Sequence, residues 1–385
     1  MLADRIRMTL GKSRKLIDRT DPNLVSNTPF YKVTHNGGRK IVRMDDGTLV
    51  TIVSQSTGSL LYKSVDNGLT WNLLKNIGYD ATDTAIVAKD SNIYVLYTYG
   101  YGTYMRAYSK EGILVNSTTI DSGQREVTRC SLALNKENNE LHACWSSKNA
   151  THPDTFNIRY CRGNIRSDGT VSWDSLEPLT TINNSGVDGQ TSSTIVLLNG
   201  NPIIIFNYDS ASTNQYGIGG YLYNGTNWVL VSGSILGIYH AKDYRQSSPS
   251  ACVDRDGVIH ICWYGRNAEA TVTTVMYKKS IDGGRKWSVP ERVVPSGSAT
   301  DRPSIAVNKK GEVFIALVRG GIYVDIYKRI NETVWNREIS YSFANYPRLI
   351  DDNNIEFVYP LTVFNTLEYN TNYKDSVVFT GKWHE

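Results

Sequence analysis

The sequence contains few cysteines, and they do not have the spacing of a metal site. Among 385 residues there are 5 cysteines, and a low, odd number argues against a disulfide-stabilised scaffold. No Cys-x-x-Cys pair occurs, and the 6 histidines are scattered along the chain. The pattern therefore predicts no metal site and no cofactor.

Long apolar runs are also missing. No stretch approaches the ~18 apolar residues that a membrane-spanning helix needs. The first 20 residues lack the continuous apolar core and the small-residue cleavage site of a secretory signal. We therefore expect no membrane insertion and a chain that is cytoplasmic as made. If the protein acts outside the cell, it would reach the outside without a Sec signal.

The body of the chain has no excess of one charge. Residues 1–20 contain six of the 41 basic residues and two of the 37 acidic residues. The rest of the chain therefore contains 35 of each. This balance argues against nucleic acid as a partner. Residues 1–34 show no hairpin pattern and are interpreted as a basic N-terminal arm, which could anchor the protein to a larger assembly or lend a strand to the fold.

Glycine, tyrosine and tryptophan are abundant, with 31, 25 and 8 residues, which favours strands and tight turns over helices. One segment recurs: a short apolar run, a polar turn and a second apolar run. Its seven copies are RKIVRMDDGTLVTIV from Arg39, TAIVAKDSNIYVLY from Thr84, CSLALNKENNELHACW from Cys130, STIVLLNGNPIIIF from Ser193, PSACVDRDGVIHICW from Pro249, PSIAVNKKGEVFIAL from Pro303 and PRLIDDNNIEFVYP from Pro347. Each copy predicts a β-hairpin with Asp-Gly, Asn-Gly or similar turn chemistry.

A second turn, usually ending in tryptophan, follows most of these hairpins. Six of the eight tryptophans occupy that place: Trp71, Trp173, Trp228, Trp287, Trp335 and Trp383. Each unit then holds two hairpins, hence four antiparallel strands, and radial repetition of such units is typical of a β-propeller. The sequence predicts an all-β propeller of seven four-stranded blades, with six blades as the alternative. The expected blades are 35–77, 78–121, 122–182, 183–233, 234–294, 295–339 and 340–385 within one propeller domain, 35–385.

Two of the tryptophan turns share a fuller pattern. SVDNGLTW contains Ser64, Asp66, Gly68 and Trp71, and SIDGGRKW contains Ser280, Asp282, Gly284 and Trp287. The first turn matches Ser-x-Asp-x-Gly-x-Thr-Trp in full and the second has Lys286 in the threonine place; this pattern resembles the Asp-box, or BNR repeat, of sialidase-like propellers. An aspartate in a tight turn accepts backbone hydrogen bonds, and glycine supplies positive φ. We therefore interpret these eight residues as structural.

The resemblance implies a ligand face around the propeller axis, formed by residues just before each repeated segment. Arg129 and Arg302 occupy equivalent places there, one residue before the strand. Converging arginines can hold a carboxylate or sulfate, or can pair with neighbouring acids and tie blades together. The ligand-binding candidates on this face are Arg129, Arg245, Arg302, Asp83, Asp188, Asp243, Asp301 and Tyr346.

The catalytic pattern of the sialidase family is missing where it can be checked. No Arg-Ile-Pro motif occurs ahead of the first hairpin, Arg39 is displaced from its place, and no tyrosine–glutamate nucleophile pair can be assigned. We therefore name no catalytic residue and expect a non-catalytic member of the superfamily.

Three functions remain open on the sequence. The preferred hypothesis is a recognition module that binds a glycan or a protein, because exposed aromatic residues suit sugar stacking. Its Asn-, Thr- and Tyr-rich composition also resembles bacteriophage virion proteins, which suggests a tail or capsid-associated receptor-binding role. The alternative is a carbohydrate-active enzyme, a divergent sialidase-like glycoside hydrolase or a polysaccharide lyase, acting on acidic glycans. The third hypothesis is a purely structural role, in which the arginines and acidic residues around the propeller axis only tie the blades together.

Overall fold

The computed structural model describes residues 14–15, 24–26, 38–55, 58–79, 81–181, 189, 191–210, 215–231, 246–266, 272–294, 300–321, 323–342, 344–349, 362–367 and 376–381. Within these ranges the chain forms strands and turns, and no helix is long and apolar enough to cross a membrane. Residue Trp383, the last of the predicted turn tryptophans, lies outside them.

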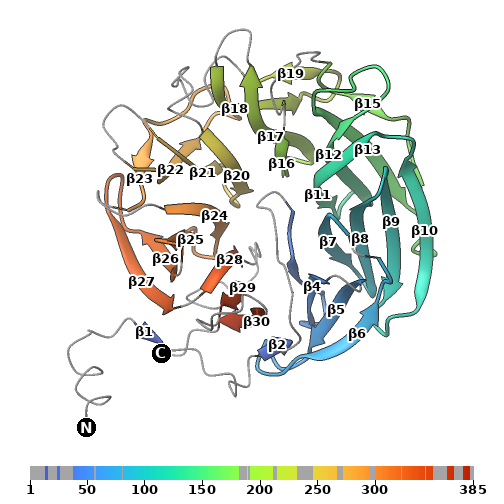
Figure 1. Cartoon of the computed structure of the whole chain (residues 1–385), viewed down its shortest axis with the longest axis horizontal. Coiled ribbons are helices and arrows are strands. Elements are labelled where there is room, and N and C mark those ends of the chain that lie inside the picture. The colour runs from blue at the N-terminus through green and yellow to red at the C-terminus, as the bar shows by residue number, and fades with distance from the viewer. Residues whose placement is uncertain are drawn as a thin grey trace.

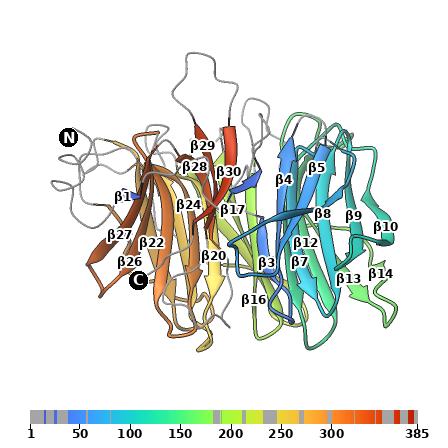
Figure 2. The ribbon, with the colours of Figure 1, turned by 90° about the horizontal axis from the view of Figure 1, so that it is seen from below.

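The described strands form seven separate sheets, arranged as a ring in Figure 1 and as a thick disc in Figure 2. We number these sheets as blades 1 to 7 in chain order. The architecture is a β-propeller, as the sequence predicts, and the seven sheets agree with the predicted count of seven hairpin units.

The first three blades lie on the right of Figure 1. Blade 1 contains β3 (Ile41–Arg43), β4 (Leu49–Gln55), β5 (Gly58–Ser64) and β6 (Asn72–Asn76). Blade 2 contains β7 (Asp83–Lys89), β8 (Asn92–Tyr99), β9 (Gly102–Ser109) and β10 (Leu114–Asp121). Blade 3 contains β11 (Glu126–Asn135), β12 (Glu140–Lys148), β13 (Asn157–Ile165) and β14 (Val171–Trp173), with β15 (Glu177–Pro178) also paired to β13.

The next three blades continue around the ring. Blade 4 contains β16 (Thr191–Leu198), β17 (Asn201–Ser210), β18 (Gln215–Tyr223) and β19 (Trp228–Leu230). Blade 5 contains β20 (Gln246–Val253), β21 (Ile259–Gly265), β22 (Thr274–Ser280) and β23 (Glu291–Arg292). Blade 6 contains β24 (Thr300–Val307), β25 (Val313–Arg319), β26 (Tyr323–Arg329) and β27 (Trp335–Ser342), which ends beyond the predicted boundary at 339.

Blade 7 closes the ring with strands from both ends of the chain. It combines β28 (Ala344–Leu349), β29 (Thr362–Leu367) and β30 (Ser376–Gly381) with β2 (Leu24–Ser26), which runs antiparallel to β30. A further strand, β1 (Arg14–Lys15), pairs in parallel with β27 of blade 6. The segment 1–34 is therefore more than a free arm, because it supplies strands to two blades.

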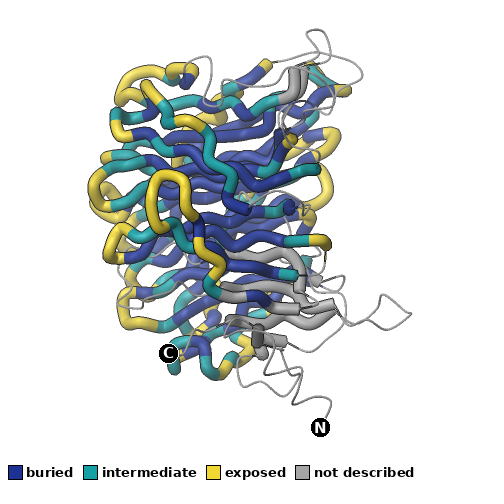
Figure 3. The backbone as a smooth tube through the Cα atoms, turned by 90° about the vertical axis from the view of Figure 1, so that its left-hand side faces the viewer, coloured by how far each residue is buried: buried dark blue, intermediate teal, exposed yellow. Residues whose placement is uncertain are grey.

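Position within a blade decides how apolar a strand is. In Figure 1 the first strands lie innermost and the fourth strands outermost. The second strand of blade 2, β8, is buried along six consecutive residues and has the continuous apolar run expected of a strand covered on both faces. The outermost strand of the same blade, β10, consists mostly of exposed and half-buried residues, and Figure 3 shows that exposure concentrates at the turns.

Adjacent blades are joined by a repeated aromatic contact. Tyr160 of blade 3 packs edge-on against Trp228 of blade 4, with ring centroids 4.8 Å apart. The Trp228 indole N–H donates to Glu177 Oε2 of blade 3 at 2.7 Å. Tyr277 of blade 5 packs in the same way on Trp335 of blade 6, at 5.1 Å. These outer-strand tryptophans therefore hold neighbouring blades together.

The two Ser-x-Asp-x-Gly turns connect the third and fourth strands of their blades. The Ser64 hydroxyl donates to Asp66 Oδ1 at 2.7 Å and accepts the Gly68 N–H at 2.8 Å. Asp66 Oδ1 also accepts the Thr70 N–H at 2.9 Å, and Gly68 has a φ of 86°. Asp66 is partly desolvated, but these hydrogen bonds still lower its pKa to about 2.

The second such turn repeats this geometry. Gly284 N–H donates to Ser280 Oγ at 2.9 Å, and Lys286 N–H donates to Asp282 Oδ1 at 2.8 Å. The Trp287 indole N–H donates to the Gly284 carbonyl at 3.1 Å, and Trp287 packs against the apolar cluster between blades 4 and 5. Hydrogen bonding and packing within the turn account for these side chains.

Candidate functional site

The first strands of blades 3 to 6 carry a β-bulge at the same place. The register shifts lie at Thr128/Ser131, Thr191/Thr194, Ser247/Ser250 and Asp301/Ser304. Each bulge holds one non-glycine residue with positive φ: Arg129 at 56°, Ser192 at 55°, Ser248 at 51° and Arg302 at 48°. This conformation is unfavourable for such residues. Bulges redirect side chains and are frequent beside functional sites.

Serine hydroxyls beside three of these bulges tie the bulged strand to the backbone of the next blade. The hydroxyls of Ser131, Ser250 and Ser304 accept the backbone N–H of Ile195, Ile305 and Leu349 on the next blade, at 3.2, 3.2 and 3.1 Å. Each serine lies two residues after its bulge residue. The repeated geometry shows that the bulges are built into the ring rather than local irregularities.

We call Arg129, Ser192, Ser248, Arg302 and Asp301 the ring-axis site, because their strands are the innermost of the ring (Figure 1). The Arg129 guanidinium reaches across to blade 4 and donates to Ser192 Oγ. Arg302 Nη1 lies 3.5 Å from Asp301 Oδ1, with the two side chains 33% and 37% exposed. Partial burial raises the pKa of the Asp301 carboxyl, and Arg302 lowers it in part.

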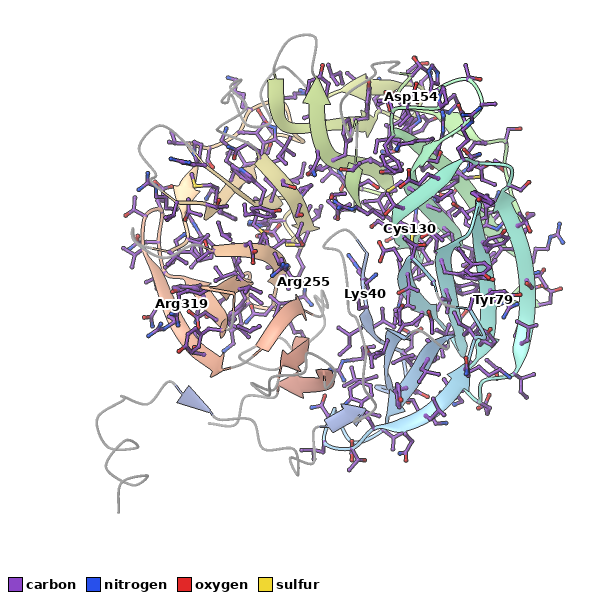
Figure 4. The ribbon with its side chains drawn as sticks, in the orientation of Figure 1. Lys40, Tyr79, Cys130, Asp154, Arg255 and Arg319 are labelled. Carbon is purple, nitrogen blue, oxygen red and sulfur yellow. The ribbon has the colours of Figure 1, made fainter. Side chains whose placement is uncertain are left out.

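Asp83, another predicted ligand-binding residue, has a different environment. Its carboxylate lies 2.6 Å from Lys40 Nζ of blade 1, and both side chains are almost fully buried. Lys40 also donates to the Thr84 carbonyl, and Figure 4 places Lys40 near the centre of the ring. Burial and pairing make Asp83 a residue that joins two blades, so the expected direct contact with a ligand is not supported.

The other predicted ligand-binding residues are described only in part or not at all. Asp188, Asp243 and Arg245 lie outside the described residues. The backbone of Tyr346 lies in β28, within a register shift between Asn345 and Arg348 that matches the other bulges. Of the eight candidates, the structure therefore brings Asp301 and Arg302 together and places Arg129 at the equivalent point of blade 3.

Sequence reasoning missed Lys40, Ser192 and Ser248. A signal was present for the serines. The triplets Arg129-Cys-Ser131, Ser192-Ser-Thr194, Ser248-Pro-Ser250 and Arg302-Pro-Ser304 share a small hydroxyl residue two places after the bulge residue. Lys40 carries no local signal, because its partner lies 43 residues away.

Two of the described histidines, His142 and His260, are buried against a tyrosine of their own blade and do not belong to this site. His142 Nδ1 lies 2.8 Å from the Tyr160 hydroxyl, and His260 Nδ1 lies 2.7 Å from the Tyr277 hydroxyl. Burial, reinforced by nearby Arg162, lowers the pKa of His142 to about 4. His142 is therefore neutral near pH 7 and has no access to solvent for proton transfer with a ligand.

The ring-axis site thus offers two guanidinium groups, two hydroxyls and one carboxyl with a raised pKa. Guanidinium groups bind carboxylates and sulfates with matched geometry. A carboxyl group whose pKa is raised can donate a proton. Among the described residues, no group of three histidine, cysteine or acidic side chains could hold a metal ion.

Comparison with known proteins identifies the fold class of the chain. No protein-family model matches the chain, and no curated protein matches it. A PL25 ulvan lyase, a polysaccharide lyase solved in complex with -[GlcA(1-4)Rha3S]-, shares 7% identity over 92% of this chain and 94% of its own, with a TM-score of 0.65. The α-L-arabinanase of Penicillium chrysogenum, solved with arabinobiose, shares 14% identity over 93% and 96%, with a TM-score of 0.52. The β-propeller domain of the Trilobed protease of Pyrococcus furiosus shares 10% identity over 93% and 95%, with a TM-score of 0.51. At these identities the likeness shows the propeller fold alone.

Proposed function

We propose that this chain is a carbohydrate-active propeller that binds and cleaves an acidic polysaccharide at the ring-axis site. Arg129 and Arg302 hold a carboxylate or sulfate group of the substrate, and Asp301 is the carboxyl group that supplies a proton. The observation that carries the proposal is the placement of both arginines on equivalent, conformationally unfavourable bulges in innermost strands.

The fold neighbours support this choice among the three hypotheses. Two of the similar structures are carbohydrate-active enzymes, and one of them was solved with a sulfated, uronate-containing saccharide. They favour the enzymatic alternative over the virion recognition module. A purely structural ring is less well supported, because the side chains of Arg302 and Asp301 keep about a third of their surface exposed.

The test is a panel of sulfated and uronate-containing polysaccharides, with neutral ones for comparison. Elimination next to a uronate gives an unsaturated product that absorbs in the ultraviolet, whereas hydrolysis gives new reducing ends without that absorbance. Affinity electrophoresis in gels that contain the same polysaccharides measures binding separately from cleavage.

The variants Arg129→Ser and Arg302→Ser are suited to this test, because Ser192 and Ser248 already occupy the same backbone position. Loss of a charge-assisted contact should weaken binding roughly ten- to hundredfold. Arg285→Ser is the matched control, since Arg285 is exposed in the turn after β22 and its loss changes the charge equally. Equal binding by all three variants would contradict the proposal, and binding without any product would limit it to recognition.

A further inference from the structure

Four tyrosines lie within eight residues of blade 2, in the segment YTYGYGTY over residues 97–104. Residues two apart on a strand share a face, so Tyr97 and Tyr99 of β8 point to the same side of the sheet. Tyr97 pairs across the sheet with Tyr104 of β9, and the two rings stack with centroids 5.4 Å apart. The hairpin between β8 and β9 therefore carries a row of aromatic rings.

A further tyrosine, Tyr79 in the segment after β6, extends this row. Its ring stacks on Tyr97 with centroids 5.6 Å apart and contacts the ring of Tyr99 at 5.1 Å. The Arg106 guanidinium carbon lies 4.7 Å from the Tyr79 ring centroid, and Arg106 Nη2 donates to the Tyr79 hydroxyl at 3.2 Å. Arg106 Nη1 also donates to the Ile77 carbonyl at 2.8 Å. The inner side of Tyr99 is therefore held by fixed groups, so a ligand on its outer side has little to order.

Two tyrosines of this hairpin, Tyr99 and Tyr101, are open to solvent, with 42% and 68% of their surface exposed. Gly100, with a φ of 56°, is the first residue of the two-residue loop and supplies the conformation that such a loop needs there. Tyr101 is the second loop residue, so it stands at the tip of the hairpin. Among the described residues, every other large apolar side chain that is exposed is valine, leucine or isoleucine. The exposed aromatic side chains of this part of the chain are thus both at one hairpin tip.

The hairpin tip lies on the same face of the propeller as the ring-axis site. The Gln124 N–H donates to the Tyr101 carbonyl at 3.0 Å. Gln124 comes two residues before β11, the strand that carries Arg129. The tip of blade 2 therefore contacts the segment that leads directly into the ring-axis site, and this contact also anchors the backbone of Tyr101.

The distance between the two places is short. Cys130, the residue after Arg129, donates its thiol hydrogen to the Leu96 carbonyl of β8 at 3.8 Å. Tyr99 lies three residues further along β8 than Leu96, which is roughly 10 Å along a strand. Figure 4 places Tyr79 on the blade 2 side of the ring, away from its centre. A short oligosaccharide can therefore reach from Arg129 to the exposed tyrosines.

The chemistry of the hairpin tip suits the face of a pyranose. The C–H groups on one face of the sugar pack against an aromatic ring, while the tyrosine hydroxyls remain available to the sugar hydroxyls. Both exposed side chains are uncharged, so the tip does not depend on an acidic group of the ligand. A lipid surface would favour aliphatic side chains, and the exposed ones in the described residues lie elsewhere.

We propose that Tyr99 and Tyr101 form a stacking subsite for a pyranose residue of a polysaccharide. Tyr79 and Arg106 are positioning residues, which fix the inner side of Tyr99. The inference rests on the proposed function only for the view that the same polysaccharide chain continues into the ring-axis site. The protein then binds the polysaccharide at two places, through ionic contacts at the axis and through apolar stacking at the hairpin tip.

Salt separates the two kinds of contact, because dissolved ions screen the exposed arginines and do not weaken stacking. Biolayer interferometry on immobilised neutral polysaccharides (xylan, glucan and arabinan) and on sulfated and uronate-containing ones measures binding in dilute buffer and in ~1 M NaCl. We expect at least one polysaccharide to remain bound at high salt. Tyr101→Ala and Tyr99→Ala should each weaken this binding roughly two- to tenfold, because each removes one aromatic contact.

Two further variants identify the ring as the cause. Tyr101→Phe keeps the ring and should keep most of the binding. Ile113→Ala is the matched control and should bind like the wild type, because Ile113 is 67% exposed in the same blade, at the opposite end of β9 (Gly102–Ser109). Tyr101 is exposed at a loop tip, so Tyr101→Ala should fold normally even if Tyr99→Ala loosens the packing on Tyr79, and chemical unfolding of each variant checks this.

Three outcomes would overturn the subsite. The first is that no polysaccharide of the panel stays bound at high salt, and the second is that Tyr101→Ala binds as well as the wild type. The third is self-association that Tyr101→Ala abolishes in sedimentation experiments, without polysaccharide binding, which would assign the hairpin tip to a second copy of the chain.

The variants Arg129→Ser and Arg302→Ser separate this inference from the proposed function. They should lose affinity for acidic polysaccharides in dilute buffer and keep the affinity that remains at high salt. If these two variants bound and cleaved like the wild type while Tyr101→Ala bound weakly, the proposed function would fail and the stacking subsite would stand.

Discussion

Lys40 of blade 1 and Asp83 of blade 2 form an ion pair, Nζ to Oδ1 2.6 Å, with side chains only 2% and 1% exposed. The pair is reinforced within blade 2, where Asp83 Oδ1 accepts the Thr84 N–H at 2.8 Å. Removing one member leaves the other charge buried without its partner. Lys40→Met should therefore lower the free energy of unfolding by ~3–5 kcal/mol.

The double variant Lys40→Met/Asp83→Leu checks the reason for that loss. It removes both charges, so it should recover a large part of the stability in urea titrations. If the double variant were as unstable as the sum of its single variants, the buried charge would not explain the effect. Binding of acidic polysaccharide by the folded double variant should persist, because Asp83 is buried in the blade interface.

The Ser248 bulge allows a test of how strongly the positive φ of the bulge residues affects stability at the ring-axis site. Ser248 has a φ of 51°, and its N–H donates to Asn207 Oδ1 at 2.8 Å. Asparagine tolerates this conformation, whereas a β-branched residue does not. Ser248→Val should therefore be less stable than Ser248→Asn by ~1–2 kcal/mol in thermal or chemical unfolding. Equal stability would mean that the bulge can relax.

Asp66 should matter for stability and not for ligand binding. Hydrogen bonds from Ser64 and Thr70 lower its pKa to about 2, below the ordinary 3.8. For a carboxyl group with a lowered pKa, the stabilisation is present above its ordinary pKa and is lost as pH falls towards 2. Asp66→Ala should cost ~1–3 kcal/mol at neutral pH, with a smaller difference from wild type near pH 2.

Unfolding curves at several pH values measure this effect, and Asp66→Asn is the control, since it retains an oxygen for the Thr70 N–H. A stable Asp66→Ala protein that had lost its polysaccharide affinity would show that the turn belongs to a ligand site instead.

Much of the fold could be predicted because its signals are local. Hairpins such as that around Gly47 are marked by adjacent turn residues, and their repetition gives the number of blades. The closing strand β2 could be suggested but not placed, because its register against β30 is set by residues more than 300 positions away. Sequence position also identified Arg129 and Arg302 as equivalent, since the residues that follow them repeat.

The rest of the site depends on contacts between distant segments. Asp83 is buried and paired with Lys40, which lies 43 residues away, and no nearby residue indicates this pairing. Arg159 is an ordinary strand residue in sequence, and its burial, at 3% exposed, appears only in the packed structure. Positive φ at Arg129 follows from a cross-strand register shift, which composition does not encode.

His142 gives the clearest expectation for stability against pH. Burial and the nearby Arg162 charge lower its pKa to about 4, from an ordinary 6.5. Glu140 Oε2 lies 3.9 Å from His142 Nε2, but the Tyr160 hydroxyl is its only hydrogen-bond partner among the described residues. A histidine with a lowered pKa folds in the neutral form, so the unfolded chain binds more protons between these pH values. Its contribution to the free energy of unfolding is complete above pH 6.5 and declines as pH falls to 4, by ~3 kcal/mol in all.

His142→Gln, which stays neutral throughout, should flatten the decline in the free energy of chemical unfolding measured across this range. His260 is the comparison, because its Nε2 lies 3.1 Å from Asp254 Oδ2, whereas His142 Nε2 has no hydrogen-bond partner among the described residues. If His260→Gln flattened the decline as much as His142→Gln, the assignment to His142 would be wrong.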